Sequence, residues 1–127
     1  MADWPGGVAA ITVFAEDLAR TKRFYTEVFG LPVVFEDEDS AVFRFGGTLL
    51  NLLDAEAAPE LIEPATVAPA DGGARFQLTL HVEDVDVLCE QLTARGVQLL
   101  NGPMDRPWGP RTASFRDPAG TIWEIAS

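Results

Sequence analysis

Ala-Ile-Thr-Val-Phe-Ala-Glu-Asp-Leu at residues 10–18 and Gln-Leu-Thr-Leu-His-Val-Glu-Asp-Val at residues 77–85 align without a gap. In both stretches, apolar and more polar residues alternate up to a shared Glu-Asp pair. Alternation with a period of two predicts a strand with one buried face. The two copies lie too far apart for a solenoid repeat. We therefore expect one domain over residues 1–127, built from a module at 8–54, a linker at 55–74 and a second module at 75–127.

Each leading strand is followed by a predicted helix, over residues 18–29 and 85–95. Asp17 and Asp84 stand at the start of these helices, where a short carboxylate accepts from the free amides of the first turn. Further short strands are predicted after each helix, at residues 32–37, 41–46 and 48–53 in the first module and at 97–101, 111–116 and 121–126 in the second. Each module is thus a strand, a helix and three strands (βαβββ), which makes the fold class α+β.

The two faces of each leading strand differ in character. We expect the aliphatic faces to pack under the helices, because a helix needs an apolar partner. The opposite faces carry Thr12 and Phe14 in the first copy and Gln77, Thr79 and His81 in the second. These faces are expected to line a space that is more polar than a core.

Composition excludes several classes of partner. The formal net charge of −11 repels phosphate backbones, so nucleic acid is not an expected partner. The same charge would attract a cationic small molecule, or it serves only to keep the protein soluble. No apolar run approaches the roughly 20 residues that span a bilayer, and the start MADWPGGVAA does not resemble a secretory signal. With the single Cys89, these features predict a cytoplasmic protein without a membrane partner.

Three stretches carry a resemblance to a known family, and together they span nearly the whole chain. They are Asp17-Leu18 with the Phe-Tyr-Thr-Glu-Val-Phe-Gly-Leu run at 24–31, Val82-Glu83-Asp84-Val85 with Gly96-Val97, and Phe-Arg-Asp-Pro-Ala-Gly-Thr-Ile-Trp-Glu-Ile at 115–125. In this order and spacing, the chain resembles the vicinal oxygen chelate superfamily of glyoxalases, bleomycin-resistance proteins and extradiol dioxygenases. The resemblance implies two tandem modules whose curved mixed sheets surround a cup-shaped cavity.

The resemblance also implies where a metal would be held. In metal-using relatives, ligands come from the first and last strands of each module, and those positions fall on Ala10, Asn51, Gln77 and Glu124 here. Only Glu124 is a strong ligand for a hard metal ion. We therefore expect no metal and no other cofactor. If a divalent metal does bind, we expect Glu124 to hold it with Gln77 and His81.

The resemblance is closest to the metal-free bleomycin-resistance-like proteins, which sequester drugs without transforming them. We accordingly expect a binding protein for a small aromatic or cationic molecule, such as a natural-product antibiotic, and a role in resistance. The predicted ligand-binding residues are Thr12, Phe14, Asn51, Gln77, Thr79, Trp108, Arg111 and Glu124. Trp108 would stack on a planar ligand or close the end of the barrel, and Arg111 would hold an anionic group or pair with Glu124.

Two other functions stay open at this point. One is a lyase, isomerase or dioxygenase of the same superfamily, which would use Glu124 to bind a metal. The other is an accessory or regulatory protein whose cup serves protein contacts. We also expect a homodimer, because the open sheets of such a fold gain from a partner.

Overall fold

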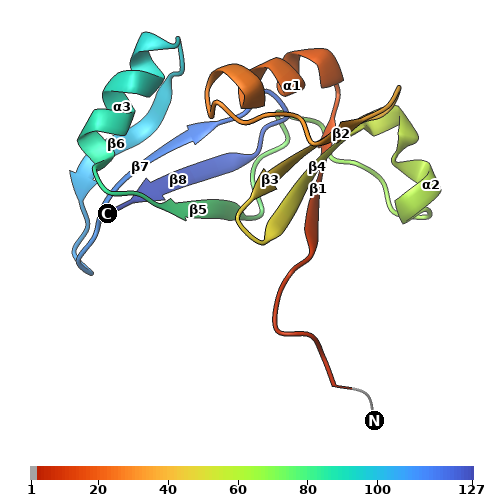
Figure 1. Ribbon diagram of the computed structural model, residues 1–127, viewed down its shortest axis with the longest axis horizontal. Coiled ribbons are helices and arrows are strands. Elements are labelled where there is room, and N and C mark those ends of the chain that lie inside the picture. Colours follow the sequence, from red (N-terminus) through yellow and green to blue (C-terminus); the bar gives the residue numbers. More distant parts are fainter. Residues whose placement is uncertain (1–2) are drawn as a thin grey trace. The chain divides into compact units, whose positions relative to one another are not determined.

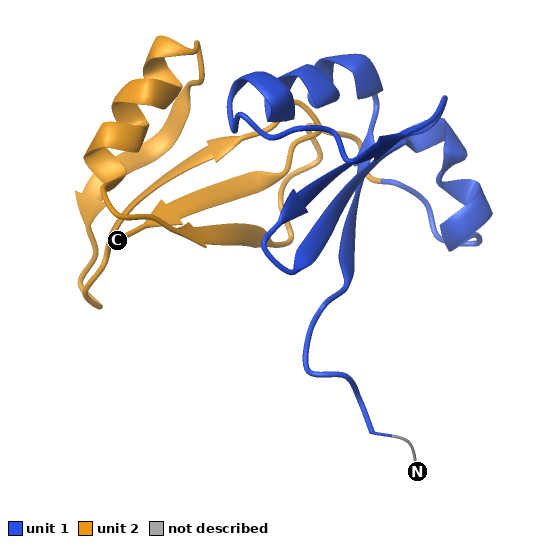
Figure 2. Ribbon diagram, in the orientation of Figure 1, with its two compact units in different colours: residues 1–67 blue, residues 68–127 orange. Residues whose placement is uncertain are grey.

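The structure of the chain is a computed structural model that describes residues 3–127, so residues 1 and 2 of the predicted domain lie outside the described residues. It consists of two compact units, residues 1–67 and residues 68–127 (Figure 2). The boundary between the units falls inside the segment 55–74 that the sequence assigns to a linker. Among the described residues, no helix has both the length and the apolar character needed to cross a bilayer.

The first unit holds a four-stranded mixed sheet in the order β1-β4-β3-β2 (Figure 1). Its strands are β1 (Ala10–Ala15), β2 (Phe35–Glu36), β3 (Ser40–Phe45) and β4 (Thr48–Asp54), and α1 (Leu18–Glu27) follows β1. β1 and β4 pair in parallel, and the remaining neighbours pair antiparallel. A short 3-10 helix (Ala55–Ala57) and α2 (Pro59–Ile62) follow β4. Both short helices lie inside the predicted linker, and Pro59 stands at the first position of α2, where its missing amide proton costs no helical hydrogen bond.

The second unit repeats this arrangement with the order β5-β8-β7-β6 (Figure 1). Its elements are β5 (Gln77–His81), α3 (Val85–Ala94), β6 (Leu99–Asp105), β7 (Arg111–Arg116) and β8 (Ile122–Ala126). β5 and β8 pair in parallel, while β8, β7 and β6 pair antiparallel. The predicted α+β class and the two βαβββ modules are therefore confirmed.

The core of each unit lies between its helix and one face of its sheet. α1 packs against β3 and β4, and α3 packs against β6 and β7. In the first unit, the buried residues of this sheet face are Val13, Ala15, Ala41, Phe43, Leu50 and Leu52; in the second unit they are Ala113, Phe115, Trp123 and Ile125. The aliphatic face of β1 is on the helix side of its sheet with Val13 and Ala15 buried, as expected, whereas Leu78 and Leu80 on the corresponding face of β5 are only half-buried.

Both predicted helix caps form in the structure. The Asp17 side chain accepts a hydrogen bond from Arg20 N at 3.0 Å, and the Asp84 side chain accepts one from Val87 N at 3.2 Å. Each helix also ends close to the predicted position, one or two residues before it. The matching caps explain why the Glu-Asp pair recurs, because each Asp fixes the point at which a strand turns into a helix.

Two strands differ from the sequence prediction. β2 contains only Phe35–Glu36 rather than residues 32–37, since Pro32 has no amide proton to donate to a ladder. β6 runs to Asp105 instead of ending at 101, and it includes Pro103. An edge strand tolerates a proline at an irregular position, and the register of β6 shifts on both sides of Asn101. The extension matters because it carries the chain directly into the β6–β7 hairpin.

Candidate functional site

Two predicted site residues meet on the face of the second sheet that is turned away from α3, here called the open face. Thr79 of β5 lies opposite Glu124 of β8, and the Thr79 hydroxyl donates a 3.0 Å hydrogen bond to Glu124 Oε1. The Glu124 side chain is half-buried, and no second described residue donates to its carboxylate. Since a carboxylate has about four acceptor positions, Glu124 retains capacity to accept from a ligand.

The same row continues across the sheet to β6. Glu124 pairs with Ser114 of β7, and Ser114 pairs with Asn101 of β6. Two interstrand spacings separate Glu124 from Asn101, which amounts to about 10 Å. Asn101 Oδ1 accepts a 2.9 Å hydrogen bond from Nη2 of Arg106. The row therefore runs from a carboxylate on β8 to a guanidinium held at β6.

Trp108 projects from the hairpin between β6 and β7. The hairpin is closed by hydrogen bonds from Arg106 N to Pro110 O at 2.8 Å and from Gly109 N to Arg106 O at 3.0 Å. The Trp108 side chain is 73 % exposed, and the Arg106 guanidinium carbon lies 5.8 Å from the centre of its ring. A large aromatic side chain is thus held at the surface by a cation–π contact rather than buried in the core.

The open face of the first sheet, turned away from α1, brings three further predicted residues together. Thr12 of β1 lies opposite Asn51 of β4, and Asn51 Nδ2 donates to the Thr12 hydroxyl across a long 3.5 Å. Phe14 shares this face and is half-buried beside Leu53. The polar pair Thr12–Asn51 thus stands in the first unit where Thr79–Glu124 stands in the second.

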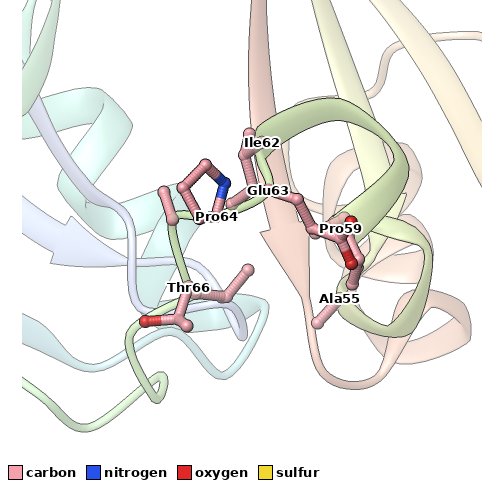
Figure 3. Close-up of a pocket in the computed structure, with 9 residues that line it drawn as sticks. Ala55, Pro59, Ile62, Glu63, Pro64 and Thr66 are labelled. Carbon is pink, nitrogen blue, oxygen red and sulfur yellow. The ribbon is translucent and has the colours of Figure 1, made fainter.

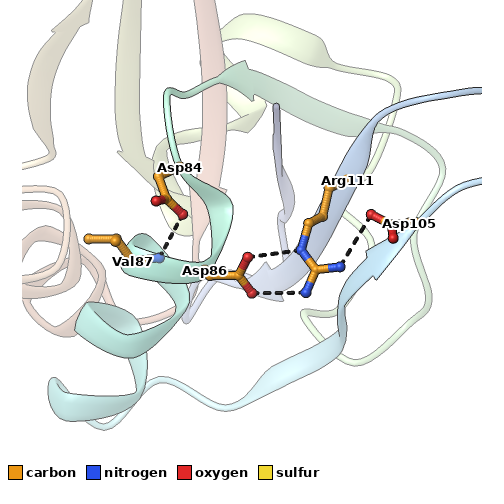
Figure 4. A network of polar contacts seen from close by, with 5 residues as sticks. All are labelled: Asp84, Asp86, Val87, Asp105 and Arg111. Carbon is orange, nitrogen blue, oxygen red and sulfur yellow. Dashed lines mark hydrogen bonds and ion pairs between the residues drawn. The ribbon is translucent and has the colours of Figure 1, made fainter.

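Arg111 does not pair with Glu124, and that prediction is wrong. Its Nε and Nη2 donate to the two carboxylate oxygens of Asp86 on α3, both at 2.9 Å, and Nη1 donates to Asp105 at 3.2 Å (Figure 4). The cause is strand alternation, because Thr112 and Ser114 occupy the open face and Arg111 therefore points to the helix side. All three guanidinium nitrogens are in use, so Arg111 is left out of the binding surface considered below.

This ion pair changes the acid–base properties of both partners. Hydrogen bonding to Arg111 lowers the pKa of the Asp86 carboxyl below its ordinary value. Hydrogen bonds to Asp86 and Asp105 raise the pKa of the Arg111 guanidinium further. Arg111 is therefore a permanent tie between the start of α3 and the β6–β7 hairpin.

The residues that would hold a metal do not fit one. Gln77 and His81 share the open face with Thr79, but each is two residues away from it, about 7 Å along the strand. The residue opposite Glu124 is Thr79, whose hydroxyl already occupies Oε1. Within residues 3–127, no group of three or more His, Cys, Asp or Glu side chains is placed to hold a metal ion. The donor set around Glu124 is therefore one carboxylate and a neutral hydroxyl.

Cys89 serves as a core residue, as its place on the apolar stripe of α3 predicts. Its side chain is buried, and burial raises the pKa of the thiol. A raised pKa lowers the fraction of reactive thiolate at neutral pH. Cys89 therefore offers no activated nucleophile, although it lines a shallow hollow of about 510 Å³ beside α3.

A separate hollow in the first unit contains none of the predicted site residues. It measures about 470 Å³ and is formed by the segment that follows β4, with Ala55, Pro59, Ile62, Glu63, Pro64 and Thr66 around it (Figure 3). Its wall is largely aliphatic and offers one carboxylate, Glu63. This hollow is an alternative place for a ligand to bind, so an experiment has to distinguish it from the open face of the second sheet.

Sequence reasoning missed Arg106. The residue stands in the Asn-Gly-Pro-Met-Asp-Arg-Pro-Trp-Gly-Pro run at 101–110, whose prolines and glycines predict a loop. One signal was available, because Arg106 is two residues from Trp108 and both flank Pro107 at a predicted hairpin. Only the structure shows that Asn101 and Thr112 hold the guanidinium, since those bonds depend on the register of β6 with β7.

Comparison with known proteins gives a consistent family. Residues 7–125 match the glyoxalase/bleomycin resistance protein/dioxygenase superfamily. The chain is 33 % identical over 119 residues to the uncharacterized protein YraH of Bacillus subtilis (strain 168), covering 91 % of this chain and 93 % of YraH.

Two solved structures show the range of activities among similar folds. A glyoxalase-related enzyme from Fulvimarina pelagi superposes with a TM-score of 0.81 at 31 % identity, covering 96 % of this chain and 88 % of that one. TnmS3, an antibiotic binding protein from Streptomyces sp. CB03234, superposes with a TM-score of 0.74 at 25 % identity, covering 98 % and 97 %. The shared fold thus occurs in both an enzyme-related protein and a binding protein.

Proposed function

Because this chain belongs to the glyoxalase/bleomycin resistance protein/dioxygenase superfamily, we propose that it is a metal-free binding protein for a small aromatic or cationic molecule. The binding surface is the open face of the second sheet, with Thr79 and Glu124 at its centre and Trp108 at its edge. The protein would act in the cytoplasm by sequestering its ligand, for example a natural-product antibiotic. The proposal is supported by TnmS3, an antibiotic binding protein with a similar fold.

The observation that carries the proposal is the Thr79–Glu124 pair. The Thr79 hydroxyl holds a half-buried carboxylate in place with a 3.0 Å bond and leaves its second oxygen to accept from a donor. A hydrogen bond to a charged group contributes about 1.5–3 kcal/mol. An ammonium or hydroxyl group on a ligand would therefore be held and oriented here.

Trp108 supports the aromatic part of the proposal. The residue is 73 % exposed, although burial of a tryptophan side chain would be favourable. A planar ligand would cover the ring, and stacking adds about 0.5–1.5 kcal/mol beyond the area buried. The cationic part is supported by the net charge of −11 and by Glu124.

The first sheet is proposed as a secondary binding surface. Thr12, Phe14 and Asn51 share its open face, but their polar atoms are neutral, so they select a ligand more weakly than Glu124 does. Gln77 extends the second surface along β5. Substituting the residues of one surface at a time measures how much each surface contributes to the affinity for a ligand.

A thermal-shift screen in EDTA tests the proposal. Aromatic and cationic natural products are screened, and calorimetry on each hit compares the wild type with Glu124→Gln and Trp108→Ala. We expect hits whose affinity falls in both variants and does not change when the chelator is omitted. A stoichiometric divalent metal that is lost in Glu124→Ala, together with turnover of a substrate, would instead support the enzyme reading.

The oligomeric state is tested on the same protein by light scattering. We propose a homodimer, which would have a mass near twice the 13.7 kDa of the chain. A mass of one chain at all concentrations would contradict that part of the proposal. A stable protein partner in pull-downs, with no hit in the screen, would favour an accessory role.

A further inference from the structure

Arg106 and Trp108 form a second recognition element on the second unit, at the opposite end of the row that begins at Glu124. We propose that this pair binds an anionic oxygen carried on a planar aromatic ring, so that the preferred ligand is an aromatic acid or phenolate with a hydrogen-bond donor at its far end. This inference rests on the proposed function and specifies its ligand class. It also assigns Arg106 as a residue that determines specificity.

The first argument is that the Arg106 guanidinium is fixed before any ligand arrives. Nε donates to the Thr112 hydroxyl at 2.8 Å, and Nη2 donates to Asn101 Oδ1 at 2.9 Å. The ring of Trp108 lies against the guanidinium at 5.8 Å. A side chain already held by three contacts has little rotamer entropy left to lose when a ligand binds.

The second argument concerns charge. Both bonding partners of Arg106 are neutral, and among residues 3–127 no carboxylate forms an ion pair with it. No described residue accepts from its Nη1. Arg111, by contrast, is paired with two carboxylates. A half-buried guanidinium that no carboxylate neutralises favours an anionic oxygen as its partner, and this local attraction acts against the repulsion from the chain's net charge of −11.

The third argument is the spacing along the row. Glu124 and Asn101 lie about 10 Å apart across three strands, with Asn101 bonded to Arg106. Glu124 accepts and Arg106 donates, so the two ends of the row require opposite groups on the ligand. In a two-ring aromatic compound with an acid at one end and a hydroxyl at the other, the acid can accept from Arg106 and the hydroxyl can donate to Glu124. The flat face of its rings is then free to stack on Trp108.

The test uses two probes of the same shape and opposite charge, 6-hydroxy-2-naphthoate and (6-hydroxynaphthalen-2-yl)methylammonium, titrated by calorimetry at 0.15 M salt. We expect the wild type to bind the naphthoate about tenfold more tightly than the ammonium probe. Arg106→Met should weaken naphthoate binding by about tenfold and leave ammonium binding within about twofold. The naphthoate affinity of Arg106→Lys should lie between those of the wild type and Arg106→Met, because one ammonium group cannot reproduce the paired donors of the guanidinium.

Arg111→Met is the matched control. It removes the same positive charge from the same unit, so it has the same effect on the long-range field. Because Arg111 is tied to Asp86 and Asp105 on the helix side, we expect its loss to change naphthoate affinity by less than about threefold. Melting curves of each variant confirm that the fold persists, and Arg106→Lys keeps the test valid should Arg106→Met melt early.

The outcomes separate the inference from the function beneath it. Naphthoate binding that requires Trp108 but is unchanged in Arg106→Met would overturn the inference and leave the binding function standing. A preference for the ammonium probe in the wild type would overturn it in the same way. If neither probe binds, the inference is overturned. The proposed function is overturned as well only if the natural-product screen also gives no hits.

Discussion

The two units share a backbone plan and differ in the chemistry of their open faces. At the centre of the first sheet, Thr12 faces the neutral amide of Asn51 across 3.5 Å. At the corresponding place in the second sheet, Thr79 donates to the carboxylate of Glu124 across 3.0 Å. The row in the second unit continues to a fixed guanidinium, whereas the row in the first continues through Val42 of β3 to Phe35 of β2, which are both apolar.

This difference is the reason why the proposed binding surface is assigned to the second unit. The helix caps, strand order and covered faces are the same in both units, so they serve folding. The hydroxyl–carboxylate pair and the guanidinium held by Asn101 and Thr112 occur in the second copy, whereas the open face of the first sheet carries the exposed Arg44. Binding specificity is therefore expected to follow the second unit, and stability is expected to depend on both.

The largest expected effects test the shared core. Phe43 in the first unit and Phe115 in the second are 0 % and 1 % exposed. Replacing either with alanine should cost about 3–5 kcal/mol in the free energy of unfolding, through lost burial and a cavity. Urea unfolding of both variants measures this. Losses that differ by more than about 2 kcal/mol would break the equivalence of the two cores.

The turns that close the two sheets should respond differently to one added methyl group. Gly120 in the second unit has φ +92, and a Cβ there would lie 2.3 Å from the Ala70 carbonyl oxygen. Gly46 in the first unit has φ +58 and open space around it. Gly46→Ala should cost about 1 kcal/mol from the left-handed backbone alone, and Gly120→Ala should cost about 2 kcal/mol or more. Equal shifts in melting temperature would contradict the close approach to Ala70.

The binding contrast is tested by Glu124→Gln against Asn51→Ala. Glu124→Gln should weaken a screen hit by about tenfold, because a charge-assisted bond is lost. Asn51→Ala should weaken it by about threefold or less, since a neutral bond contributes about 1 kcal/mol or less. Calorimetry on both variants with the same ligand decides. A larger loss in Asn51→Ala would place the principal binding surface on the first unit.

The smallest expected effect is the pH dependence of two acidic side chains. The Arg111 guanidinium lowers the pKa of Asp86, and the backbone amide of Asp39 lowers that of Asp37 in the first unit. A lowered pKa in the folded state contributes stability above the unfolded value of about 3.9, which is lost as pH falls through the folded pKa. Asp86→Asn should therefore reduce stability at pH 6, and the difference from the wild type should shrink as the pH falls below about 3.9.

Salt sharpens this contrast between the units. The Asp86 contribution comes from an exposed ion pair and should shrink in 1 M salt. The Asp37 contribution comes from hydrogen bonds to Asp39 N and the Ser40 hydroxyl, so Asp37→Asn should depend less on salt. Urea unfolding at two salt concentrations measures both. Equal salt dependence would show that the Asp86–Arg111 pair has no electrostatic effect.

Much of the fold could be predicted from the sequence, because its signals are local. The alternation in residues 10–15 and 77–81, together with Asp17 and Asp84, indicates where strands end and helices begin. β6 was predicted too short, since proline and glycine at 102–103 indicate a loop and only the pairing with β7 shows a strand.

The site was harder to predict, because its contacts join residues that are distant in the sequence. Thr79 and Glu124 were both candidates, but their hydrogen bond depends on the parallel register of β5 with β8. One of the two roles predicted for Arg111, a pair with Glu124, was wrong, because its partner Asp86 on α3 is 25 positions away in the sequence. Arg106 was not a candidate because its local signal, the position two residues before Trp108, does not show that Asn101 and Thr112 hold its guanidinium.

The most direct test of the central claim is an amide and indole chemical-shift map of the ¹⁵N-labelled protein, titrated with a screen hit in EDTA. Binding on the open face of the second sheet should shift the Trp108 indole and the amides of Thr79, Ser114 and Glu124, with little change at α3. Shifts confined to residues 55–67 would move the ligand to the aliphatic hollow of the first unit. Shifts that appear only after a divalent metal is added would contradict metal-free binding.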